Sequence, residues 1–187
     1  VGSGKETATA VQDYPHGVMD KYLPDSITSL EHDWALQYPQ DYLDVLGETI
    51  AAVLKESGVS VDDVIGVGLD CTSCTMLPID EQGIPLCMYD EYKHNPHAYI
   101  KLWKHHGAQR EANRMNEIAM ERGEEFLSRY GGRISSEWLF PKIWQIKREA
   151  PEIYDRAYRF IEVADWLVMQ LTGEERRNSC AAGYKAM

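Results

Sequence analysis

The stretch of sequence that decides the fold reads VIGVGLD over residues 64–70, CTSCT over residues 71–75 and MLPI over residues 76–79. Residues 64–70 are apolar almost throughout, which is typical of a strand that is buried on both faces. Gly66 and Gly68 weaken strand propensity, so they indicate a close approach of this backbone to a neighbour or a ligand. Residues 76–79 predict a second strand after the intervening loop.

Working outward from this stretch, the sequence predicts mostly helices. Residues 39–56 carry apolar side chains at helical spacing, with Pro39 in the first turn and Ser57-Gly58 as a stop. The other predicted elements are a strand at 5–14, a turn at 80–83 with a hairpin strand at 84–88, helices at 95–103, 108–130 and 136–148 (with Pro141 in its first turn), and a strand at 160–164 leading into a helix at 166–172 with Asp165 as its N-cap. Strands that alternate with helices predict an α/β layer fold, and no linker divides residues 1–187 into separate domains.

Charge and composition narrow the class of function. The chain has 187 residues and a formal net charge of −11, because 30 acidic residues outnumber 19 basic ones. An acidic surface repels a phosphate backbone, so we expect no nucleic-acid partner. No apolar run approaches the roughly 18 residues of a membrane span, so we expect no membrane partner. Four cysteines do not suggest a secreted disulfide scaffold, which favours reduced thiols and a cytoplasmic location. Because the chain lacks an initiating Met, we expect it to be processed or truncated.

The cysteines and histidines leave one alternative function open. Cys71-x-x-Cys74 lacks the following helix of a thioredoxin-type motif, and a zinc site needs four ligands where this sequence has one such pair. His94, His97 and the histidines at 105–106 could supply the remaining ligands. A Cys/His metal-binding or redox module is therefore the alternative. Ordinary loop and core cysteines, with no metal bound, are the plainer interpretation.

The loop at residues 70–75 is the candidate ligand site. It follows the carboxyl end of a predicted buried strand, which is where open α/β sheets bind their ligands. Thr72, Ser73 and Thr75 carry small hydroxyl groups, which can hydrogen-bond a polyhydroxylated molecule. A tight turn that merely connects two strands can contain the same types of residue. The sequence therefore leaves both a ligand site and a purely structural turn open.

Five segments together carry a resemblance to a known family. They are GVGLDCTSCTMLPID at 66–80, KLWKHH at 101–106, SSEW at 135–138, ADWL at 164–167 and NSCAAGYKA at 178–186. In this order they resemble the amino-terminal domain of the FGGY family of carbohydrate kinases, within the actin/hexokinase/Hsp70 superfamily. The last segment is similar to the family members that act on L-ribulose. The resemblance implies a ribonuclease H-like α/β lobe that lacks its opening strands and is truncated at both ends.

The resemblance also implies a reaction and a set of site residues. The family transfers the γ-phosphoryl group of Mg-ATP to a sugar, here L-ribulose or a related ketopentose, giving L-ribulose 5-phosphate in L-arabinose catabolism. The Thr72-Ser73-Cys74 loop would form one wall of the sugar pocket. Lys185 would hydrogen-bond the sugar, since an ammonium group carries three donors. Trp103 and Glu137 are further candidates, because their segments line the cleft in related kinases.

Departures from the family pattern limit what this chain is expected to do. Family members open with a strand carrying an Asp-x-Gly-Thr-x-Ser phosphate motif, and their catalytic aspartate and adenosine pocket lie beyond the position of Met187. We therefore expect the catalytic residue outside this chain, and ATP and Mg only in the parent enzyme with its carboxyl-terminal lobe. We expect the isolated chain to be inactive. Without opening strands, residues 64–70 would present an apolar edge, so we expect self-association or a shifted strand in the vacancy.

Overall fold

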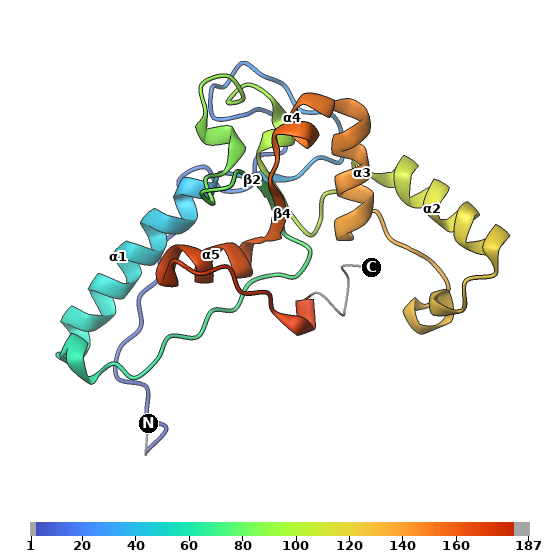
Figure 1. Ribbon diagram of the computed structural model, residues 1–187. Helices are drawn as coiled ribbons and strands as arrows, with labels where there is room; N and C mark the ends of the chain where they lie inside the picture. The colour runs from blue at the N-terminus through green and yellow to red at the C-terminus, as the bar shows by residue number, and fades with distance from the viewer. Residues whose placement is uncertain (1–2, 182–187) are drawn as a thin grey trace.

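The computed structural model of the chain describes residues 3–181, and its centre is a small antiparallel sheet (Figure 1). The strands lie in the order β1-β3-β2-β4, and their bounds are Leu36–Gln37 for β1, Met76–Ile79 for β2, Ile100–Lys101 for β3 and Arg159–Glu162 for β4. The three strand pairs are all antiparallel. Strands β2 and β4 confirm the predictions at 76–79 and 160–164, whereas the two-residue strands β1 and β3 were not predicted.

Segments that are far apart in the sequence lie side by side at the beginning of β2. Met76 pairs with Lys101 of β3 on one side and with Glu162 of β4 on the other. Because both neighbours run antiparallel to β2, its first residue meets the last residues of β3 and β4. This end of the sheet, called the Met76 end below, therefore collects the loop before β2, the loop after β3 and the beginning of helix α5 (Val163–Thr172).

Helices cover both faces of the sheet. In addition to α5, the described residues form α1 (Pro39–Ser57), α2 (Gln109–Arg122), α3 (Leu139–Glu149) and α4 (Pro151–Arg156). Helix α1 confirms the prediction at 39–56, and α3 confirms the prediction at 136–148 with Pro141 in the first turn. Figure 1 shows α1 and α2 extending away from the sheet in opposite directions. No helix within residues 3–181 has the length and apolar character needed to cross a membrane.

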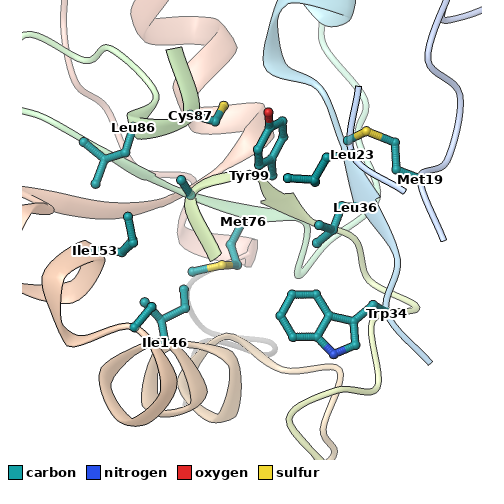
Figure 2. Packing of buried hydrophobic residues seen from close by; sticks show 12 residues of the cluster. Met19, Leu23, Trp34, Leu36, Met76, Leu86, Cys87, Tyr99, Ile146 and Ile153 are labelled. Carbon is teal, nitrogen blue, oxygen red and sulfur yellow. The ribbon is translucent and has the colours of Figure 1, made fainter. Parts of the chain in front are cut away.

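The alternation of side chains along β2 divides the core between the two faces. Met76 packs with Ile146 of α3 and Ile153 of α4, in the cluster that Figure 2 shows. Leu77 points to the opposite face and packs with Trp166 of α5. All five of these side chains are at most 1% exposed. The α/β class expected from the sequence is therefore confirmed as one sheet between two helical layers.

The helix predicted at 108–130 is interrupted, so that prediction is wrong in its second half. Helix α2 ends at Arg122, and Gly123 adopts a left-handed conformation with φ of 67°. A 3-10 helix then occupies Glu125–Tyr130. Glycine adopts positive φ without a Cβ penalty and commonly ends helices in this way.

Two shorter predictions are also wrong in the type of element. A turn is present at 80–83, but the expected hairpin strand at 84–88 is a single bridge from Pro85 to Ile79 followed by a 3-10 helix at Leu86–Met88. Proline has no N–H with which to extend a ladder, so the hairpin stops at Pro85. The helix expected at 95–103 is a 3-10 turn at Pro96–Ala98, followed after Tyr99 by β3.

The two ends of the described chain bring further corrections. Glu162, not Asp165, occupies the N-cap position of α5, because β4 passes into the helix without a loop. Asp165 lies in the first turn, where its carboxylate accepts a hydrogen bond from the Asn178 N–H at 2.8 Å. The strand expected at 5–14 is absent, and most of these residues are exposed. A strand needs a neighbour, and no described strand pairs with this segment.

Residues 64–70 bring the main correction, because they are not a buried strand. They pair with no described strand, and the backbone of 65–70 makes no hydrogen bond within residues 3–181. Ile65 is 85% exposed and Val67 is 63% exposed. Figure 1 shows this segment as the green trace that runs from the end of α1 to β2. Apolar residues alone do not make a strand, because the ladder requires a partner backbone.

Candidate functional site

The Ser73–Cys74 turn lies at the Met76 end of the sheet, immediately before β2. Thr72 is exposed, Ser73 is half-buried and Cys74 is fully buried. Cys74 has a left-handed backbone conformation with φ of 66°, which costs a residue with a Cβ on the order of 1–2 kcal/mol. The turn therefore leaves Thr72 exposed and Ser73 partly accessible, while the thiol of Cys74, whose Sγ lies 3.9 Å from Ser73 Oγ, enters the core.

Two buried charged side chains hold the backbone of Cys74. Its N–H donates to Glu162 Oε1 at 3.1 Å, and its carbonyl oxygen accepts a hydrogen bond from Lys142 Nζ at 2.7 Å. Lys142 is 0% exposed and Glu162 is 5% exposed. Lys142 Nζ also donates to the carbonyl oxygen of Leu102 at 2.6 Å. One ammonium group thus joins the loop before β2 to the loop after β3.

The loop after β3 places Trp103 at the same end of the sheet. Leu102 is buried, and its N–H donates to the Ala35 carbonyl oxygen at 2.9 Å. Trp103 follows it and is 41% exposed, so a face or edge of its indole ring is accessible. An accessible indole can pack against the C–H surface of a sugar. The turn and Trp103, both candidates from the sequence, are therefore linked through Lys142.

Glu137 faces the loop after β3 from the segment that precedes α3. Its Oε1 atom lies 3.6 Å from His106 Nε2, and His106 Nδ1 lies 3.3 Å from Ser136 Oγ. The neighbouring Trp138 is buried in one apolar cluster with Cys74. The half-buried carboxylate of Glu137 therefore belongs to the region around the turn and can accept hydrogen bonds from a polar ligand.

A buried basic cluster beneath the loop after β3 was missed by the sequence reasoning. Lys101 Nζ lies 4.0 Å from the centre of the Trp34 ring and 3.5 Å from His105 Nε2, which lies 3.0 Å from Gln145 Oε1. Burial and the nearby Lys142 ammonium lower the pKa of Lys101 well below its ordinary value. Both Lys101 and His105 are 0% exposed, so they support the loop that carries Trp103 and are not ligand groups. The only signal in the sequence is KLWKHH itself, in which nothing distinguishes buried from solvated basic residues.

A separate groove of about 610 Å³ lies between α5 and residues 67–69. Val67, Leu69, Val168 and Leu171 give it apolar walls, and Asp165 lies among its polar lining residues. Neither Ser73 nor Trp103 lines this groove. The groove therefore belongs to the unpaired segment and not to the turn.

The predicted role of Lys185 concerns a residue outside the part of the chain that the structure describes. The described chain reaches Ala181, and the segment around it is anchored by the bond between Asn178 and Asp165. The pairing of Ser73 with Lys185 around one sugar therefore stays a prediction.

The alternative of a Cys/His metal or redox module finds no support within residues 3–181. No group of three or more His, Cys, Asp or Glu side chains in that range is arranged to hold a metal ion. Cys71, Cys87 and Cys180 form no disulfide within residues 3–181. Burial, reinforced by the charge of Asp70, raises the pKa of the Cys71 thiol, which opposes formation of a reactive thiolate.

Comparison with known proteins decides the family. The family described as "FGGY family of carbohydrate kinases, N-terminal domain" matches residues 18–187. The chain belongs to this family. The FGGY chain is 59% identical to a ribulokinase of Geobacillus thermodenitrificans over 98% of its length and 33% of that protein. It is 56% identical to a ribulokinase of Halalkalibacterium halodurans over 100% of its length and 33% of that protein. It thus spans about a third of the length of these curated relatives.

Solved structures of sugar kinases share the fold of this FGGY chain. A "xyloylose kinase" from Brucella ovis aligns with a TM-score of 0.61 at 19% identity, covering 77% of this chain and 27% of that one. A gluconate kinase from Lactobacillus acidophilus aligns with a TM-score of 0.57 at 13% identity, covering 79% of this chain and 27% of that one. The expected actin/hexokinase-like lobe is therefore confirmed as the fold.

Proposed function

We propose that this chain is the sugar-binding lobe of an ATP-dependent kinase that converts L-ribulose to L-ribulose 5-phosphate. The substrate class follows from relatives named ribulokinase, which are 59% and 56% identical to nearly the whole chain. The observation that carries the proposal is the Ser73–Cys74 turn. Its accessible hydroxyls stand on a backbone that two buried charges hold in place.

The Thr72-Ser73-Cys74 loop is proposed as one wall of the sugar pocket. A serine or threonine hydroxyl donates one hydrogen bond and accepts two, as each sugar hydroxyl does. Because the turn is already fixed, little ordering entropy is lost when a sugar binds there. Trp103 would cover an apolar face of the sugar, Glu137 would accept from a sugar hydroxyl, and Lys185 would donate to a ketopentose oxygen.

The chain is proposed to position the sugar, while other parts of the parent enzyme supply the phosphoryl donor. Phosphoryl transfer depends chiefly on positioning and charge stabilisation, with a carboxylate near the attacking hydroxyl. ATP supplies the phosphoryl group, and Mg²⁺ neutralises its charge. The chain spans about a third of the length of its ribulokinase relatives. We therefore assign Mg-ATP and the catalytic aspartate to parts outside this chain, including a carboxyl-terminal lobe.

The proposed cellular role is L-arabinose catabolism in the cytoplasm, where cysteine thiols stay reduced. The proposed partners are the ketopentose, the carboxyl-terminal lobe and a second copy of the chain. The second copy would meet the exposed apolar segment at residues 64–70.

A chimeric enzyme, called the graft below, tests the proposed function. In it, residues 1–187 replace the matching third of the Geobacillus thermodenitrificans relative, and a coupled assay measures phosphorylation of L-ribulose. We expect turnover by the graft and none by the 187-residue chain alone. A folded graft that does not phosphorylate L-ribulose would contradict the substrate, and turnover by the chain alone would contradict its proposed inactivity.

A single substitution in the graft tests the role of the turn. Ser73→Ala removes one hydroxyl at the proposed sugar wall and should raise the KM for L-ribulose about 3- to 10-fold, as expected for one neutral hydrogen bond. Ser128→Ala, which removes an exposed hydroxyl bonded to its own helix, is the matched control and should change nothing. Equal KM values for the two variants would remove Ser73 from the site.

A further inference from the structure

The peptide groups on both sides of Cys74 are occupied by charged side chains from two other elements. Glu162 comes from the end of β4 and Lys142 from the first half of α3. Both are buried, and the protein loses the hydration of both charges to place them there. Neither of these bonds goes to a side chain: they end on the N–H and the carbonyl oxygen of one residue in a left-handed conformation.

These bonds also lie next to a stretch of chain whose backbone makes no hydrogen bonds in the described structure. After Cys74, the carbonyl oxygen of Thr75 accepts the Val163 N–H at 2.8 Å and β2 begins. Before Cys74, the backbone of residues 65–70 makes no hydrogen bond in the described structure. Cys74 is therefore the first residue of this connection whose backbone is held by hydrogen bonds, and the hydroxyls of Thr72 and Ser73 lie next to it.

We infer that Lys142 and Glu162 are positioning residues of the sugar site, which fix the Ser73–Cys74 turn and set the affinity for the sugar without touching it. This inference rests on the proposed function. Lys142 does more than hold the turn, because its second bond to Leu102 fixes the backbone next to Trp103. The two candidate walls thus share one ammonium group, and its removal takes one hydrogen bond from each.

Alkylation of the 187-residue chain tests the clamp independently of any sugar. The variant Lys142→Met/Glu162→Gln removes both bonds from the ammonium group, avoids a lone buried charge and keeps an acceptor for the Cys74 N–H. We expect iodoacetamide to modify Cys74 about 10-fold faster in this variant, because a released turn opens locally. Cys87 is 2% exposed in a different cluster and serves as an internal control, whose rate should not change.

A matched variant separates positioning from general destabilisation. Glu111→Gln removes a buried charge that pairs with Arg148 at 2.5 Å, and neither residue bonds to the turn. This control should leave the ratio of the Cys74 and Cys87 alkylation rates unchanged. If Cys74 and Cys87 accelerate together in Lys142→Met/Glu162→Gln, the pair merely stabilises the fold and the inference is overturned.

Kinetics of the grafted enzyme then test the consequence for the sugar. Lys142→Met/Glu162→Gln should raise the KM for L-ribulose about 10-fold, with the KM for ATP unchanged, and Glu111→Gln should change neither. An unchanged KM for L-ribulose overturns the inference. If the unsubstituted graft folds but does not phosphorylate L-ribulose, the proposed function fails instead, and alkylation alone decides whether the pair holds the turn.

Discussion

Residues 64–70 and β2 are both short apolar segments, and only the five residues 71–75 separate them. Strand β2 has a partner on each side at Met76, and its four residues are all buried. Residues 65–70 have no backbone partner in the described structure, and Ile65 is 85% exposed. Two similar sequences therefore differ in structure because one has neighbours and the other does not.

An apolar run favours burial of its side chains, but it does not by itself determine that the segment forms a strand. To form a buried strand, residues 64–70 would need a neighbouring strand to hydrogen-bond with and packed side chains on both faces. Strand β2 receives both from β4, α3 and α5. Substitutions in and next to the two segments test this difference.

The largest expected effect is on core packing. Leu77→Ala leaves a cavity beneath α5 and should lower the free energy of unfolding by about 3 kcal/mol. Ile65→Ala should change it by less than about 0.5 kcal/mol, because that side chain is exposed. Urea denaturation followed by circular dichroism measures both. A loss of more than about 1 kcal/mol in Ile65→Ala would show that residues 64–70 are already buried in solution.

The acidic residues that end the two segments should also differ. Burial alone would raise the pKa of Asp80, but hydrogen bonds from Tyr89 and from the Ile84 and Gln82 N–H groups lower it below its ordinary value. A lowered pKa gives stability that is present above about pH 4 and is lost as the pH falls through the folded-state pKa. Asp80→Asn should therefore cost about 1–3 kcal/mol at pH 7 and progressively less below pH ~4.

Asp70→Asn is the control for this pH dependence, because Asp70 is exposed and makes no hydrogen bond in the described structure. It should leave the free energy of unfolding at pH 7 unchanged within about 0.5 kcal/mol. Parallel pH curves for the native chain and Asp80→Asn would mean that the Asp80 pKa is the same in the folded and unfolded states.

Self-association should depend on the unpaired segment. Ile65→Lys/Val67→Lys places two charges on it and should weaken association of the chain about 10-fold or more, which corresponds to about 1.4 kcal/mol. Met120→Lys changes an equally accessible apolar residue on α2 and is the control. Light scattering over a range of concentrations measures the mass. A native chain that stays monomeric throughout would refute the proposed association.

The smallest expected effect concerns one glycine of each region. Gly83, in the turn after β2, has φ of 82°, and a Cβ there would lie 2.7 Å from Met169 Cε. Gly83→Ala should therefore cost about 1 kcal/mol. Nothing lies within 4 Å of a Cβ at Gly66, so Gly66→Ala should cost less than about 0.5 kcal/mol. Equal thermal shifts for the two variants would mean that Gly66 is already packed against a neighbour.

Local signals in the sequence predicted the elements that depend on local interactions. Helix α1 begins at Pro39 and α3 carries Pro141 in its first turn, both as expected. The strand at 64–70 failed because its formation depends on a partner backbone that no local pattern reports. Asp165 was assigned as an N-cap because it is a good capping residue, but β4 ends three residues earlier and Glu162 takes the position.

The sequence predicted where the candidate site lies but not which buried residues hold its backbone in place. Thr72, Ser73 and Trp103 stood out by residue type, and the antiparallel register brings their loops to one end of the sheet. Lys142 and Glu162 did not stand out, because a lysine in a helix is usually solvated. Their burial depends on backbone groups 68 and 88 residues away, so no spacing rule could have found them.

The direct passage from β4 to α5 has a mechanical consequence. Val163, the first residue of α5, donates to the Thr75 carbonyl oxygen, and the preceding Glu162 accepts from Cys74. Two consecutive residues at the beginning of the helix therefore hydrogen-bond to the consecutive residues Cys74 and Thr75. A tilt of α5 would therefore displace Cys74 and Thr75, and with them the turn next to the proposed sugar wall.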